Sequence, residues 1–345
     1  MGKEKKLFDF CLGNPPYQET ISEGNNQFKP VYNDFMDAAY SVADKTELIT
    51  PARFLSKAGA TPKQWNEKML SSHQFKVLKF YEQSADVFQG VDIKGGVVIS
   101  YFDHDADYTS IDVFIKDETM RAIFEKVKGY LTQNLGKLVH SPDSYRFTDT
   151  LFEENPKLIG RTDNSHAKAV ASSVFNRYSE IFHEDYTPGD VKVVGRQNNV
   201  RTQYCLKGTY IKDQGNLHKW KVLFAGAIGT GKFGEALSEP IIAEPEMAHT
   251  QSFVSLGELD SEFEAKALAN YMKTKFARAF LSIMKTTQNN QSKTTWSKVP
   301  FQDFTKNSEI NWEKSIHELD IQLYRKYKLS ADEVAFIEAN VKEME

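Results

Sequence analysis

The sequence lacks the features that mark membrane or secreted proteins. No apolar run approaches the roughly 20 residues that a membrane-spanning helix needs, and the opening MGKEKKLFDF has neither the apolar stretch nor the cleavage site of a secretory signal. Only two cysteines occur, Cys11 and Cys205, too few for a disulfide framework or a cysteine-based zinc site. We therefore predict two buried thiols in a cytoplasmic protein that has no membrane partner.

The sequence also lacks a basic excess and a metal-binding pattern. Lys and Arg total 43 against 47 Asp and Glu, so the whole chain does not carry the charge typical of a nucleic-acid-binding protein. Its eight histidines show no metal-ligand spacing, and we predict no metal site. Charge is uneven, however, because residues 265–298 contain seven Lys or Arg and no acidic residue. This segment predicts either a solvated helix or a local positive face.

The 345 residues are enough for two ordinary domains, and 40% hydrophobic with 26% charged residues is typical of a folded chain. In the first hundred residues, apolar runs alternate with helical spacing, which favours an open α/β sheet with crossover connections. The strands that we expect there are Leu7–Leu12, Glu47–Thr50, Phe75–Tyr81 and Gly96–Phe102. The helices are Pro30–Ala43 and one capped by Thr61 that runs through Leu70.

Beyond Asp103 the pattern changes to short β-like pieces and then to helices, which predicts a mixed α+β domain with C-terminal helices. We place the domain boundary between residues 1–116 and 117–345. The expected strands are Asp105–Ile115, Val191–Val194, Tyr204–Ile211 and Trp220–Ala225. The expected helices are Asp117–Leu135, Glu262–Lys285, Ile316–Tyr327 and Ala331–Met344, the last capped by Ser330 with Glu333 three residues on.

The tetrapeptide Asn14-Pro15-Pro16-Tyr17 directly follows the first expected strand. The side-chain carbonyl of Asn14 and the backbone carbonyl of Pro15 could both accept hydrogen bonds from an exocyclic amine and so localise its lone pair. Two prolines fix φ near −65° and hold those carbonyls rigidly. Tyr17 offers an aromatic face to a base taken out of the duplex. An ordinary Asn-Pro turn is the alternative, and the succession of elements after the tetrapeptide favours the catalytic interpretation.

This succession resembles the second half of the catalytic domain of adenine-specific DNA methyltransferases, particularly the large methylases of restriction–modification systems. The resemblance lies in FDFCLGNPPYQE, in NQFKPVYNDFMDAAYSVADKTELITPARFL and in FKVLKFYEQSADVFQGVDIKGGVVISYF. It implies a partial Rossmann-like sheet over residues 1–116, a catalytic role for Asn14 to Tyr17, and S-adenosylmethionine as the methyl donor. It also implies an aromatic on the other side of the flipped base, for which Phe114 is the candidate.

The rest of the chain resembles the target-recognition region of the same enzymes, in TQSFVSL, in the stretch from EAKALANYM to WSKVPFQDF, and in IHELDIQLYRKYKLSADEVAFIEA. The resemblance implies that double-stranded DNA is a partner of residues 117–345. Lys and Arg suit phosphates, and amides suit base edges. The candidates for DNA binding are Lys273, Lys275, Arg278, Lys285, Gln288, Asn289, Asn290, Lys293, Trp296 and Lys298.

The donor-binding half of such enzymes, with its glycine-rich turn, usually precedes the tetrapeptide, and only six residues precede Leu7 here. The one glycine-rich stretch, KVLFAGAIGTGKFGE at 221–235, nearly spells a phosphate loop, but Phe233 stands where Ser or Thr should hold magnesium. Pro240 and Pro245 argue against the helix that should follow, so we interpret this stretch as a β-turn of the recognition domain. We therefore expect S-adenosylmethionine to be bound mainly by a missing half or a partner chain.

These observations predict a DNA adenine methyltransferase polypeptide of a restriction–modification system, inactive without the donor-binding half. The alternatives are a non-catalytic DNA-binding specificity subunit, the remnant of a split methylase, or a decoy that blocks a host methylase. A half sheet would leave the edge of the Leu7–Leu12 strand unpaired, which invites association. We expect this edge to be covered by a partner chain, a homodimer mate or the recognition domain.

Overall fold

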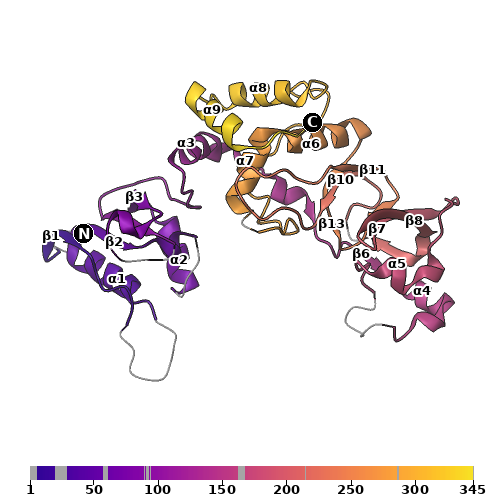
Figure 1. Cartoon of the computed structure of the whole chain (residues 1–345), viewed down its shortest axis with the longest axis horizontal. Coiled ribbons are helices and arrows are strands. Elements are labelled where there is room, and N and C mark those ends of the chain that lie inside the picture. The colour runs from indigo at the N-terminus through magenta and orange to yellow at the C-terminus, as the bar shows by residue number, and fades with distance from the viewer. Residues whose placement is uncertain are drawn as a thin grey trace, which may run out of the picture. The chain divides into compact units, whose positions relative to one another are not determined.

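The computed structural model describes residues 6–19, 29–56, 61–88, 90, 93, 95–161, 168–213, 215–285 and 287–344. The chain divides into two compact units, Met1–Glu118 (unit 1) and Thr119–Glu345 (unit 2), which we describe separately (Figure 1). Four positions in the resemblance phrase that connects the last two strands of unit 1 lie outside the described residues: Gln89, Val91, Asp92 and Lys94.

Unit 1 contains one four-stranded sheet in the order β1-β2-β4-β3. Its strands are β1 (Phe8–Gly13), β2 (Ala43–Pro51), β3 (Phe75–Tyr81) and β4 (Val97–Asp103). β1 and β2 are parallel, with α1 (Tyr32–Val42) as the crossover, and the other pairs are antiparallel. The four strands and the helix were all predicted, and the structure confirms them; the sheet is mixed, with a single parallel pair.

Both helices of unit 1 pack on one face of this sheet. Met36 and Tyr40 from α1, and Trp65 and Met69 from α2 (Lys63–Ser71), share a buried cluster with Leu48, Val98 and Phe102 of the strands. The predicted cap of α2 is shifted by one residue: Pro62 is the N-cap residue, and the Thr61 hydroxyl donates instead to Asn66 Oδ1 (2.8 Å). The apolar residues spaced at helical intervals therefore pack against the sheet, as their spacing indicates.

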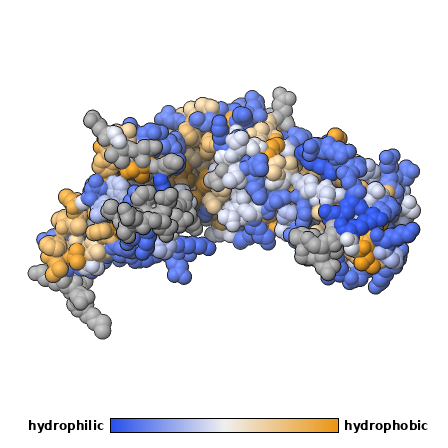
Figure 2. Space-filling view, turned by 60° about the horizontal axis from the view of Figure 1, so that its bottom comes forward, coloured by the Kyte–Doolittle hydropathy of each residue, from blue (hydrophilic) through white to orange (hydrophobic). Residues whose placement is uncertain are grey.

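β1 is the outermost strand of this sheet, and its apolar side chains are exposed. Phe8, Phe10 and Leu12 of β1 are 58%, 63% and 74% exposed, and Leu7, directly before the strand, is 77% exposed. Figure 2 shows an apolar patch over the part of unit 1 that carries β1. Cys11, on the same strand, is half-buried, so the prediction of a buried thiol is confirmed for Cys205 and wrong for Cys11.

The described residues of unit 2 form three small sheets and a group of helices. The sheets have the orders β11-β10-β13-β5, β12-β7-β8 and β6-β9. The longer strands are β7 (Asp190–Gln197), β8 (Val200–Lys207), β10 (Trp220–Ala225) and β13 (Phe253–Leu259). The short strands are β5 (Val139–His140), β6 (Tyr145–Phe147), β9 (Ile211–Asp213), β11 (Ile241–Ala243) and β12 (Met247–His249). The helices are α3 (Glu118–Val127), α4 (Asp149–Glu154), α5 (Val174–Arg177), α6 (Glu262–Lys273), α7 (Lys275–Met284), α8 (Ile316–Lys326) and α9 (Ala331–Asn340).

One predicted helix of unit 2 holds and three need correction. α8 matches its predicted range to within one residue. α9 begins at the predicted Ala331, with Ser330 and Glu333 forming the expected capping box, but it ends at Asn340 and not at Met344. The predicted helix Asp117–Leu135 ends earlier, at Val127. The single helix expected over Glu262–Lys285 is wrong, because Thr274 leaves helical geometry (ψ 146°) and its side chain caps a new helix by accepting from Ala277 N.

Two strand predictions are also corrected. Asp105–Ile115 forms no strand: the segment is irregular, and Asp112 has a positive φ of 58°. Tyr204–Ile211 is divided between the end of β8 and the start of β9. Trp220–Ala225 is β10, as predicted. Over the described part of the chain, no helix combines the length and apolar character needed to cross a membrane.

Candidate active site

The Asn14–Tyr17 corner lies at the carboxyl end of β1, beside the parallel strand β2. Gly13, the last residue of β1, pairs with Leu48, so the corner begins directly after the last residue pair between these two parallel strands. Crevices at the carboxyl ends of parallel strands are the usual ligand sites of open α/β sheets. Beyond the corner, Val31 N donates to Tyr17 O (3.2 Å) and Glu19 N to Lys29 O (3.0 Å), which ties the loop to the start of α1.

The side chains of the corner differ in exposure. Asn14 and Pro16 are exposed, whereas Pro15 and Tyr17 are half-buried. Tyr17 packs against the buried cluster of unit 1, and burial raises the pKa of its phenol to about 12. Its hydroxyl is buried and has no hydrogen-bond partner among the described residues. Since buried polar groups are normally satisfied, this orphaned hydroxyl marks a place where a ligand or water could bind.

Phe114 lies on the same cluster as Tyr17. Its ring meets Phe80 edge-on, with centroids 5.3 Å apart and planes at 70°. The irregular course of residues 105–115 therefore brings to this cluster an aromatic that is distant from Tyr17 in sequence. The role of Phe114 in base stacking stays a prediction.

Several of the DNA-binding candidates in unit 2 are buried. Arg278 is 1% exposed, and its guanidinium donates to Lys273 O (3.1 Å from Nη2), while burial lowers its pKa to about 10. Asn290 and Trp296 have no exposed surface, and Trp296 Nε1 donates to Asn290 O (2.6 Å). In this structure these three side chains are enclosed beneath the surface of unit 2, so none of them is presented to a ligand, and their role in DNA binding stays a prediction.

Three of the candidate lysines are held by carboxylates within unit 2. Lys273 pairs with Glu239 at 2.5 Å, Lys275 with Glu338 at 2.5 Å, and Lys285 lies 3.7 Å from Glu235. Their side chains are only 16%, 16% and 6% exposed, respectively. The basic stretch therefore presents fewer free charges than its sequence suggests. Gln288, Asn289 and Lys293 are exposed and Lys298 is half-buried, and these four remain candidates for contact with DNA.

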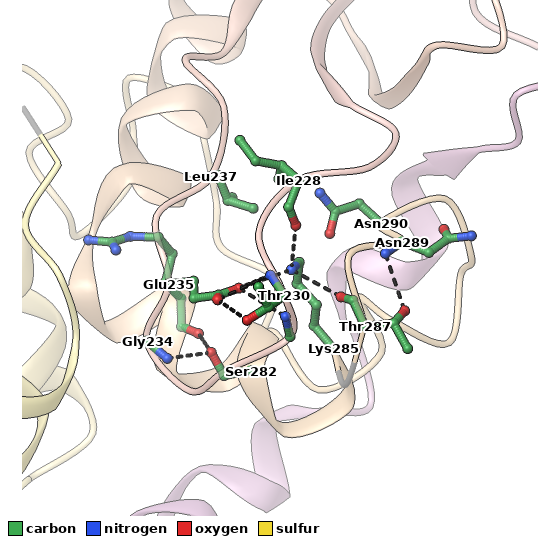
Figure 3. A network of polar contacts seen from close by, with 12 residues as sticks. Ile228, Thr230, Gly234, Glu235, Leu237, Ser282, Lys285, Thr287, Asn289 and Asn290 are labelled. Atoms are coloured by element: carbon green, nitrogen blue, oxygen red, sulfur yellow. Dashed lines mark hydrogen bonds and ion pairs between the residues drawn. The ribbon is translucent and has the colours of Figure 1, made fainter.

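The glycine-rich stretch of unit 2 binds an internal anion. The carboxylate of Glu235 accepts hydrogen bonds from the backbone N–H groups of Thr230 and Gly231, and it lies near the ammonium of Lys285 (Figure 3). No sequence motif marks Glu235, so sequence reasoning missed it. Among the described residues, no group of three or more His, Cys, Asp or Glu side chains is placed to hold a metal ion.

Comparison with known proteins connects this geometry to a family. Residues 2–88 match the Eco57I restriction-modification methylase family. A segment of 93 residues is 31% identical to a Mycoplasma pneumoniae protein described as an uncharacterized adenine-specific methylase, and the match covers 26% of this chain and 22% of that protein. The N-terminal segment, with the Asn14–Tyr17 corner inside it, is thus related in sequence to restriction–modification adenine methylases.

Two solved structures of restriction enzymes align over most of the chain. The type IIG restriction endonuclease BpuSI aligns at 10% identity and a TM-score of 0.32, over 90% of this chain and 48% of that protein. The ATP-dependent type ISP restriction-modification enzyme LlaBIII bound to DNA aligns at 12% identity and a TM-score of 0.22, over 81% of this chain and 28% of that protein. In each comparison the chain spans less than half of the length of the protein that it matches.

Proposed function

We propose that this chain is a DNA adenine methyltransferase polypeptide of a restriction–modification system. In this proposal unit 1 is half of a methyltransferase sheet and carries the catalytic loop, and unit 2 recognises the DNA target. The observation that carries the proposal is the exposed Asn14 in an Asn-Pro-Pro-Tyr corner at the carboxyl end of a parallel strand, inside the segment that matches the methylase family.

The corner suits the chemistry because the amino group of adenine is a poor nucleophile whose lone pair is delocalised into the ring. Asn14 Oδ1 and the carbonyl of Pro15 accept the two N–H groups, so the lone pair localises on nitrogen and points away from both acceptors. The Tyr17 ring stacks on the everted base, and Phe114 is the candidate for its other face. S-adenosylmethionine, when bound, supplies the electrophilic methyl group.

We place the donor mainly on another polypeptide half that packs against β1. The glycine-rich turn of unit 2 does not fit a donor site, because its N–H groups already bind Glu235. The outer edge of β1 is unpaired within unit 1 as described, and four apolar side chains at this edge are exposed. An exposed apolar edge strand favours association with a further strand or subunit.

The proposal is tested in source cells that carry an affinity-tagged copy in place of the native one. Loss of the chain should remove N6-methyladenine from one sequence context in genomic DNA. The tagged wild type should restore it and Asn14→Ala should not, whereas Asn199→Ala, in the β7–β8 turn, should behave as wild type. A non-catalytic specificity subunit or remnant predicts that Asn14→Ala restores methylation as well as the wild type does.

Donor binding is tested separately by calorimetry. The purified chain alone should show no micromolar binding of S-adenosylmethionine, and the assembly captured through the tag should bind it. Clear micromolar binding to the isolated chain would refute the separate donor-binding half and leave the catalytic role of Asn14 open to the cellular test.

A further inference from the structure

The glycine-rich turn of unit 2 is an anion-binding turn that the chain fills with its own carboxylate. Glu235 accepts hydrogen bonds from Thr230 N (2.8 Å), Thr230 Oγ1 (2.6 Å) and Gly231 N (3.0 Å). These bonds, that of the Thr230 hydroxyl first, lower the pKa of Glu235 to about 2, so the group is anionic throughout the physiological range. Gly229 has φ +71°, and a Cβ there would lie 2.3 Å from Glu235 Oε2, so only glycine admits the carboxylate.

A buried lysine joins this turn to the segment that follows α7. Lys285 Nζ donates to Ile228 O (2.9 Å) and to Thr287 O (3.1 Å), and Glu235 balances its charge at 3.7 Å (Figure 3). The two segments also pair through their backbones, since Ile228 N donates to Gln288 O (2.8 Å) and Asn290 N to Gly226 O (2.9 Å). We call residues 226–235 and 287–291 the paired loops.

The outward polar side chains of the paired loops include no acidic group, and the loops also expose the apolar side chains of Ala227 and Phe233. Thr230, Lys232, Gln288 and Asn289 are exposed, and Glu235, the one acidic residue of these segments, is turned inward onto the turn. Next along the chain, Lys293 lines a shallow groove of about 450 Å³ whose other lining residues are Asn134, Gly136, Lys137, Thr294 and Ser297. Amides beside lysines and hydroxyls are the combination that contacts base edges and phosphates.

We propose that the paired loops, together with the adjacent Lys293, form a preformed DNA-contacting edge, in which Gln288 and Asn289 face base edges and Lys232 and Lys293 face phosphates. Glu235 is the positioning residue: it holds the turn closed and, through Lys285, fixes the two amide side chains relative to Lys232. The inference rests on the proposed function, because it takes duplex DNA as the ligand of unit 2. It also explains the near match to a phosphate loop, since the internal carboxylate occupies the place of a phosphate.

The contacts are tested on the full chain, or on its assembly, with duplex DNA selected from a randomised pool and measured by fluorescence anisotropy. Lys232→Ala should weaken binding to all sequences alike and reduce the slope of log affinity against log salt by about one. Gln288→Ala and Asn289→Ala should weaken binding to the selected sequence about 10-fold and change unselected DNA little. Lys314→Ala, an exposed lysine beside Glu318 in the acidic C-terminal region, is the matched control and should bind as wild type does.

The positioning role has its own readout. Glu235→Gln keeps the size of the side chain and removes its charge. It should speed hydrogen exchange at the Thr230 and Gly231 amides and reduce the preference for the selected sequence about 10-fold, with salt-dependent binding to unselected DNA retained. Glu239→Gln, whose carboxylate is exposed and pairs with Lys273, should leave both properties unchanged.

The outcomes separate this inference from the proposed function. A wild-type assembly that binds no duplex DNA refutes the role of unit 2. Wild-type binding that survives unchanged in all four paired-loop variants overturns the inference alone. Protection of the Thr230 and Gly231 amides by ATP or inorganic phosphate would also overturn it, because the turn would then be a phosphate site.

Discussion

His249 should make the stability of unit 2 depend on pH. The imidazole has no exposed surface; its Nδ1 donates to Thr250 O (2.9 Å), so its Nε2 accepts from the Ser255 hydroxyl (3.0 Å). This arrangement requires the neutral ring, and burial is the main cause that lowers the pKa of His249 from 6.5 to about 4. An imidazolium would be cut off from water, would be opposed by the charge of Lys221, and would break the hydrogen bond that the Ser255 hydroxyl donates.

The direction and the size of the pH effect on stability follow from the difference between the pKa of His249 in the unfolded and in the folded chain. The unfolded chain takes up the proton near pH 6.5 and the folded chain only near pH 4, so the stability present above pH 6.5 is lost as the pH falls through this window. The slope is about 1.4 kcal/mol per pH unit, and the total is about 3 kcal/mol. Between pH 7 and pH 5 the loss due to His249 is therefore about 2 kcal/mol.

The assay is urea unfolding of the full chain, followed by tryptophan fluorescence, for wild type and His249→Asn. Asparagine can still donate to Thr250 O but cannot titrate, so the stability difference between the two proteins should shrink by about 2 kcal/mol from pH 7 to pH 5. Asn216→Ala is the control: it removes a buried amide that donates to Ser255 Oγ (3.2 Å) and Gly257 O (3.0 Å), and its cost should not change with pH. If the difference in the free energy of unfolding between wild type and His249→Asn stays constant with pH, His249 is not the group that makes the stability of unit 2 depend on pH.

Two further predictions concern the chain end and the sheet edge. Gly234→Ala should lower the free energy of unfolding of unit 2 by about 1–3 kcal/mol, because φ at Gly234 is +70° and the new Cβ would lie 2.2 Å from Asn340 O. Gly129→Ala is the control: its Cβ would meet nothing within 4 Å, so the same urea titration should show almost no change. Replacing Phe8 and Leu12 by lysine should reduce self-association of the isolated chain in sedimentation velocity, whereas Leu78→Lys on β3 should not. Equal sedimentation of all three proteins would mean that the β1 edge is not adhesive.

The elements of unit 1 could be predicted because their signals are local. Short apolar runs predict the strands β1 to β4, and the helical spacing of Met36 and Tyr40 predicts the helix between the first two strands. The break between α6 and α7 escaped prediction because the apolar spacing continues across Thr274. It depends on a remote carboxylate, since Asp320 on α8 accepts from Lys275 N (3.0 Å) and Phe276 N (2.8 Å).

The candidate site divides in the same way. The place of Asn14 to Tyr17 at the end of a strand could be predicted, because a tetrapeptide after a strand is a local signal, and their catalytic role stays a prediction. The surface of unit 2 could not, because burial depends on contacts between distant segments: Trp296 and Arg278 look like ligand contacts in sequence, but both are enclosed by the fold. Glu235 could not be predicted, because the N–H groups of the glycine-rich turn can bind any carboxylate that the fold brings to them, and no sequence motif marks which one this is.

We propose above that Asn14 and Pro15 orient the amino group of an everted adenine. The most direct measurement is single-turnover transfer of tritiated methyl groups from S-adenosylmethionine to its DNA target by the captured assembly, wild type against Asn14→Ala. We expect Asn14→Ala to lose about 10²–10³-fold in rate with its DNA affinity unchanged, because one preorganised acceptor is removed from the transition state. Methyl transfer by Asn14→Ala at the wild-type rate would contradict this proposal.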